Sequence, residues 1–171
     1  MKTYKEISNA YAHAYNDGLR AFDDVKVLAT KIRANLEQLV DIPNAVLFAP
    51  HDETANFDPQ HSPAVAGSVA YCPKAHAWII GFALKVTVAG SIIPAEWLRF
   101  FVVVTVKPDS CVLKLRDTQK TEEIPRAEGE GTNDKIKTFV DSISDGIAEH
   151  YLNLPEMREG GGIKIIHGFG A

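Results

Sequence analysis

Two apolar runs in the middle of the chain decide the fold: HAWIIGFALKVTV, His76–Val88, and EWLRFFVVVTVK, Glu96–Lys107. In each run large apolar residues occupy alternate positions, and successive side chains of a strand point to opposite faces of a sheet. The alternation therefore predicts one core face, made of Trp78, Ile80, Phe82, Leu84, Val86 and Val88 in the first run and of Leu98, Phe100, Val102, Val104 and Val106 in the second. β-branched and aromatic residues also suit a pleated surface. The two runs together predict a long antiparallel hairpin.

The opposite face of this hairpin is more apolar than a sheet face open to water. It has an apolar centre and a cationic rim, a combination that commonly marks an interaction site. The interaction residues that we predict on it are Ile79, Lys85, Trp97, Arg99, Phe101 and Val103. Three kinds of cover are open for this face: a helix in a three-layer arrangement, a second copy of the chain, or a ligand or peptide in a groove.

Further short strands extend the hairpin into an antiparallel meander of about five strands. Apolar or alternating runs lie at 45–49, 67–72, 111–116 and 122–124, and turn signals such as Pro108-Asp109-Ser110 separate them. Strands and helices do not alternate along the chain as they do where a parallel sheet is built. The sheet is therefore expected to be antiparallel.

Residues 5–40 predict a long amphipathic helix. Apolar residues recur every three or four positions, at Tyr11, Phe22, Val25, Ile32, Leu36 and Leu39, and the stripe is widened by Ile7, Leu19 and Leu28. Gly18 leaves open whether the helix is continuous, because glycine disfavours a helix interior. A continuous helix would be on the order of 50 Å long. Such a helix either packs across the sheet, which we favour, or projects to find a partner.

A second helix is expected near the end of the chain. Thr132 or Asn133 is its predicted N-cap, Pro155 lies at its predicted end, and its apolar face holds Ile136, Phe139, Val140, Ile143, Ile147, Tyr151 and Leu154. A flexible glycine-rich tail, 159–171, follows, and we expect its apolar run Ile163–Ile166 to join a sheet edge or a partner. The order of helix, antiparallel sheet and helix defines an α+β fold, in a single domain that spans 1–171.

Composition limits the classes of function. The chain has 171 residues, of which 46% are hydrophobic and 23% charged, as expected for one globular domain. Its net charge of −4 argues against a nucleic-acid partner. The two cysteines are too few for a disulfide scaffold, and the sequence shows neither a signal peptide nor an apolar run of about 20 residues that would span a membrane. We therefore expect a cytoplasmic protein with no membrane partner.

The polar stretch PHDETANFDPQHSP, Pro50–Pro63, is predicted to be a surface loop. It offers His51, Asp58 and His61 as candidate ligands of a divalent metal, because imidazole nitrogens and carboxylate oxygens suit zinc and related ions. The spacing matches no established metal motif. The alternative is a solvated loop held by Asx-type turns.

The sequence contains no diagnostic catalytic motif. The glycine run at 160–162 lacks the lysine of a phosphate-binding loop, and no serine lies in a nucleophile-elbow pattern. We therefore favour a non-enzymatic protein-interaction or assembly module that forms homo-oligomers or binds another protein, of a kind found among small bacterial and phage proteins. The alternative is a metal-dependent enzyme or a small-ligand-binding protein that uses the loop from His51 to His61.

Overall fold

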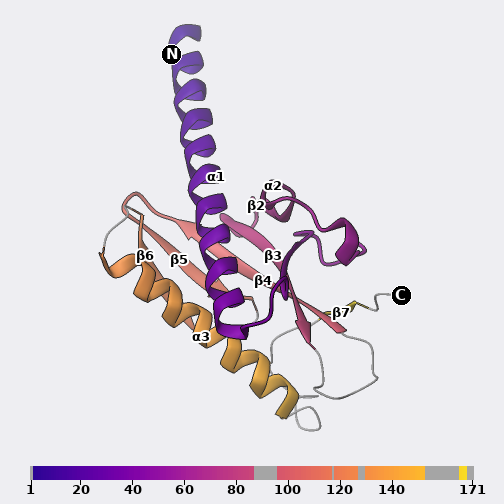
Figure 1. The fold of residues 1–171 in the computed structure, drawn as a ribbon. Helices are drawn as coiled ribbons and strands as arrows, with labels where there is room; N and C mark the ends of the chain where they lie inside the picture. The colour runs from indigo at the N-terminus through magenta and orange to yellow at the C-terminus, as the bar shows by residue number, and fades with distance from the viewer. Residues whose placement is uncertain (1, 87–95, 117, 127–129, 153–165, 169–171) are drawn as a thin grey trace.

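In a computed structural model of the chain, a long helix, an antiparallel sheet and a second helix follow one another (Figure 1). The structure describes residues 2–86, 96–116, 118–126, 130–152 and 166–168. This order confirms the α+β class that the sequence predicts. None of the described helices combines the length and the apolar character that crossing a membrane requires.

Seven strands of the described residues form the sheet. Five of them lie across it in the order β1-β3-β4-β5-β6, while β2 pairs with β3 and β7 pairs with β4. The strands are β1 (Val46–Ala49), β2 (Val69–Cys72), β3 (Ala77–Val86), β4 (Glu96–Val106), β5 (Ser110–Leu115), β6 (Thr121–Pro125) and β7 (Ile166–Gly168). Strands β3 to β6 form the predicted meander, with every pairing antiparallel. Strand β7, at the end of the expected apolar run, joins the sheet at β4. The rest of the predicted tail, 159–165 and 169–171, lies outside the described residues.

Both helices, α1 (Tyr4–Val40) and α3 (Glu130–Leu152), contribute to one core with a single face of the sheet. The register places Phe82 opposite Phe100, and their rings stack with centroids 5.4 Å apart. The predicted core face of the hairpin is confirmed: its described residues are buried in this core or packed against its edge. The apolar face of α3 is confirmed for Ile136, Phe139, Val140, Ile143 and Ile147. Among the described residues, α1 and α3 therefore lie on the same face of the sheet.

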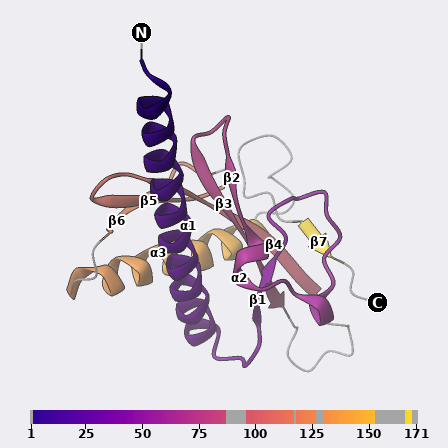
Figure 2. The same ribbon diagram turned by 90° about the horizontal axis from the view of Figure 1, so that it is seen from above.

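Helix α1 is continuous through Gly18, and it begins in a capping box formed by Thr3 and Glu6. Its C-terminal half packs on the sheet and buries Val25, Leu28, Ala29, Ile32 and Leu36. Every described residue from Lys2 to Arg20 is exposed. Figures 1 and 2 show this N-terminal half of α1 projecting beyond the sheet. The expected packing of the helix across the sheet is thus found for one half of its length.

Replacing Gly18 by alanine is expected to stabilise the protein by about 0.5–1 kcal/mol, because alanine loses less backbone entropy than glycine in a helix interior. A Cβ atom at this position meets nothing within 4 Å. The free energy of unfolding, measured by urea denaturation, checks this expectation. A loss of stability would mean that the helix bends at Gly18 in solution.

Two local elements differ from the prediction. Residues Val65–Ser68, expected to begin a strand at 67, form one helical turn, α2, before strand β2. Helix α3 begins at Glu130, before the expected caps at Thr132 and Asn133, and Thr132 is buried within it. Short propensity patterns at element ends do not resolve such shifts of two residues.

Candidate interaction site

The loop from 50 to 61 covers the centre of the sheet face opposite α1 and α3. The guanidinium group of Arg99 donates hydrogen bonds to three carbonyl oxygens of this loop, those of Ala55 at 2.7 Å, Asp52 at 2.8 Å and Pro50 at 3.0 Å. Arg99 is only 2% exposed, and burial lowers the pKa of its guanidinium group. Arg99, one of the predicted interaction residues, therefore holds a loop of its own chain.

The aromatic residues of this face also have partners within the chain. Phe101 is buried, and the guanidinium carbons of Arg99 and Arg116 lie 5.6 and 5.2 Å from the centre of its ring. Trp97 packs edge-on against Phe57, with ring centroids 5.9 Å apart. The other predicted interaction residues are all partly buried: Ile79, Lys85 and Val103. In the described part of the chain, the loop thus covers the centre of this face, and α1 and α3 both lie on the other face.

The three candidate metal ligands all lie on the same loop with exposed side chains. Nδ1 of His61 and Oδ2 of Asp58 are 2.5 Å apart, and Asp58 also caps a short helical turn, η1 (Pro59–His61). Hydrogen bonds from His61 and from the Gln60 amide lower the pKa of Asp58. Within the described ranges, no three His, Cys, Asp or Glu side chains come close enough together to hold a metal ion. Within the loop, Asp52 and Asp58 each accept a hydrogen bond from the amide two residues further on, as in Asx-type turns.

Helix α1 carries most of the exposed apolar side chains of the described residues. Nine large hydrophobic side chains are exposed in this part of the chain, and five of them lie in the first half of α1: Tyr4, Ile7, Tyr11, Tyr15 and Leu19. We call these five side chains the exposed stripe. Their spacing of three or four residues continues the stripe that the same helix buries in the core. The rings of Tyr11 and Tyr15 stack on one another, 6.3 Å apart.

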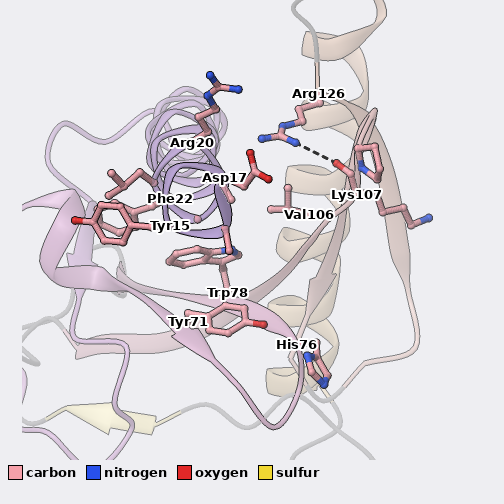
Figure 3. Close-up of a pocket in the computed structure, with 15 residues that line it drawn as sticks. Tyr15, Asp17, Arg20, Phe22, Tyr71, His76, Trp78, Val106, Lys107 and Arg126 are labelled. Atoms are coloured by element: carbon pink, nitrogen blue, oxygen red, sulfur yellow. Dashed lines mark hydrogen bonds between the residues drawn. The ribbon is translucent and has the colours of Figure 1, made fainter. Parts of the chain in front are cut away.

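A groove of about 1000 Å³ opens at the base of the exposed stripe, between α1 and the end of the sheet (Figure 3). Helix α1 lines it with Tyr15 and Phe22, and the β2–β3 hairpin lines it with Tyr71, His76 and Trp78. The ring centroid of Trp78 lies 5.5 Å from that of Phe22 and 5.3 Å from that of Tyr71. The groove therefore has an aromatic floor that is continuous with the exposed stripe.

Ion pairs and hydrogen bonds fix α1 at the edge of this groove. Nε of Arg126 donates to Oδ2 of Asp24 at 2.6 Å, and Nη1 of Arg126 donates to the carbonyl oxygen of Lys107 at 3.4 Å (Figure 3). Further up the helix, Nδ1 of His13 and Oδ2 of Asp17 are 2.8 Å apart. The Arg126–Asp24 pair joins α1 to the residue that follows β6, whereas the His13–Asp17 contact lies within the helix.

Comparison of the chain with protein-family models, with curated proteins and with solved structures finds no match.

The periodicity of the sequence identifies much of the exposed stripe, but it does not identify the groove. Ile7, Tyr11 and Leu19 belong to the predicted helical stripe, and a repeat of 3.6 residues continues unchanged where the sheet beneath the helix ends. The lengths of the elements indicate that the helix projects. The 37 residues of α1 extend to about 55 Å. The 11 residues of β4, the longest strand, extend to about 36 Å. A helix longer than its sheet must project at one end.

Proposed function

We propose that this chain is a non-enzymatic protein-interaction module that self-associates through the exposed stripe of α1. The observation that carries the proposal is the continuity of one helix face, which is buried from Val25 to Leu36 and exposed from Tyr4 to Leu19. Apolar surface removed from water contributes about 25 cal/mol per Å². Contiguous exposed apolar surface of this kind is typical of protein–protein contacts.

The projecting half of α1 is helical without a partner. Its first turn is closed by the Thr3 amide, which donates to Oε2 of Glu6 at 2.7 Å, and by the Glu6 amide, which donates to the Thr3 hydroxyl at 3.3 Å. The hydrogen bonds that the Thr3 amide and the Thr3 hydroxyl donate to the Glu6 carboxylate lower its pKa. An isolated helix of this length is marginal in water, so a capping box contributes to keeping it folded. A preformed helix loses less conformational entropy on binding.

The two cysteines agree with a non-catalytic protein in a reducing compartment. The cysteines Cys72 and Cys111 are free thiols, which suits the cytoplasm. Cys111 is buried, and burial raises the pKa of its thiol, so this sulfur is a poor nucleophile. We therefore place the module in the cytoplasm and assign its apolar surfaces to association.

Replacing Tyr11 by lysine is expected to weaken self-association by about 30-fold or more, the effect of removing a central aromatic contact at an interface. Tyr11 is 71% exposed, so the substitution leaves the core intact. Sedimentation velocity over a concentration series, with the wild-type chain alongside, gives the dissociation constants of both proteins.

The matched control is Asn16→Lys, which adds the same charge to an exposed residue of α1 about 120° around the helix from the centre of the exposed stripe. This variant is expected to associate like the wild type. A wild-type chain that stays monomeric throughout the series, or two variants that weaken association equally, would contradict the proposed function.

A further inference from the structure

We propose that two copies of this chain pair their projecting helices in antiparallel orientation, so that the tip of each α1 enters the groove at the base of the other. This inference rests on the proposed self-association and specifies its geometry. The exposed stripe and the groove together form one apolar strip that runs from Tyr4 at the tip to Trp78 at the base.

A symmetric dimer uses the same surface on both copies, so this strip must complement itself. In an antiparallel pair the aromatic tip of one helix lies at the level of the other copy's groove. A parallel pair would place tip against tip, and no projecting segment would reach the level of the groove. The antiparallel arrangement therefore brings the tip to the level of the contacting rings of Phe22 and Trp78, and the parallel arrangement does not.

One antiparallel register matches the apolar side chains of the strip in pairs. Residues whose numbers sum to 26 lie opposite one another in it. The facing pairs are Tyr4 with Phe22, Ile7 with Leu19, and Tyr11 with Tyr15. Each pair joins a residue of the tip half to one nearer the base, so both ends of the strip are used.

One charge pair beside the strip agrees with the same register. Lys5 and Asp23 lie on one flank of the strip, five helical turns apart, so Lys5 of one copy comes within a turn of Asp23 of the other. Opposite charges across an interface favour one orientation of the partners.

The area available is sufficient for a dimer. The tyrosines of the exposed stripe are 86%, 71% and 56% exposed. Since an aromatic side chain presents about 150–250 Å², these three alone offer roughly 400 Å² per copy. With Ile7, Leu19 and the walls of the groove, each copy reaches the range of about 600–1,000 Å² per partner that specific dimers bury.

Cysteine pairing tests the orientation on the full chain. In a Cys72→Ala background, we would prepare Ile7→Cys and Leu19→Cys as separate proteins and oxidise each alone and as an equal mixture with diamide. Both positions are exposed, so neither substitution disturbs the core. The mixture is expected to give a disulfide-linked species at twice the 18.7 kDa of one chain. Each protein alone is expected to give none, because like positions lie about 18 Å apart in the antiparallel pair.

The matched control is Asn16→Cys mixed with Ile7→Cys, which is expected to give no linked species because position 16 lies about 120° around the helix from the centre of the strip. Self-linking of Ile7→Cys alone would indicate a parallel pair and overturn the inference while the proposed function stands. A dimer in sedimentation without linking in any mixture would place the contact elsewhere and overturn it as well. A monomer in sedimentation would overturn the proposed function and the inference together.

A second measurement tests the groove itself. Tyr4→Asp is expected to weaken dimer formation at least about ten-fold, because Tyr4 of one copy inserts at the level of Phe22 in the other. In the monomer Tyr4 is 86% exposed, so its replacement leaves the fold unchanged. A dimer as tight as that of the wild type would show that the tip stays in water, and this result would overturn the insertion into the groove.

Discussion

Replacing Arg99 by methionine is expected to lower the free energy of unfolding by about 3 kcal/mol and to release the loop from 50 to 61. The variant leaves three carbonyl oxygens, those of Pro50, Asp52 and Ala55, without their donor. A buried acceptor that loses its donor costs about 1–3 kcal/mol, and access of water to the freed loop keeps each loss near the lower limit. Methionine retains most of the buried aliphatic volume, so the loss reports the hydrogen bonds. Urea denaturation measures the stability, and chymotryptic cleavage after Phe57 measures release of the loop.

Arg116→Met is the matched control for Arg99. Arg116 lies over the same Phe101 ring, but its only described salt bridge, to Glu53 at 3.4 Å, is partly exposed. Such a pair contributes less than about 1 kcal/mol, so the control is expected to stay close to the wild type and to keep the loop protected. Equal losses in the two variants would show that packing on Phe101, and not the carbonyl contacts of Arg99, holds the loop.

The strands and helices follow from side-chain patterns and could be predicted from the sequence. The position of the loop from 50 to 61 over the sheet face opposite the helices could not. Alternation in β3 and β4 identifies both the buried face and the unusual apolar character of the other face. The partners of Arg99 are backbone carbonyls from a polar, non-periodic segment. Backbone acceptors leave no trace in a residue pattern, so the same arginine suggested a cation on the rim of an open surface.

The candidate site divides in the same way. The exposed stripe follows from helical spacing, which local sequence encodes. The groove requires Phe22 and Trp78, which lie far apart in the sequence, to meet at the end of the sheet. Its position depends on where the sheet stops beneath α1, and this is a property of strand pairing. The predicted interaction surface on the sheet and the exposed stripe of α1 are therefore separate surfaces. Phe101 belongs to the first of them, where it is buried and contributes to packing.

Replacing Gly81 by alanine is expected to lower the free energy of unfolding by about 3 kcal/mol, at the upper end of what overpacking costs. A Cβ atom on Gly81 would lie 2.5 Å from the carbonyl oxygen of Ala49 and 2.6 Å from that of Pro50. These are backbone atoms that cannot rotate away, and β3 is held between β1 and β4 at this point. Gly18→Ala, with open space around its new Cβ, is expected to change stability in the opposite direction. A neutral Gly81→Ala variant would mean that the end of β1 moves freely over the sheet.

The effects of Gly81 and Arg99 are expected to be coupled, because both act on the position of Pro50. The missing side chain of Gly81 lets the Pro50 carbonyl approach the sheet, and Nη2 of Arg99 then donates to that carbonyl at 3.0 Å. Once one substitution has displaced Pro50, the second substitution costs less stability, because the contact with the Pro50 carbonyl is already lost. The double variant Gly81→Ala, Arg99→Met should therefore lose about 1 kcal/mol less than the two single losses added together. Strict additivity in this double-mutant cycle would mean that the entry of the loop and its anchor at Arg99 are independent. Coupling would mean that Gly81 and Arg99 together hold the start of the loop against this sheet face. The exposed stripe of α1 would then remain the surface for association.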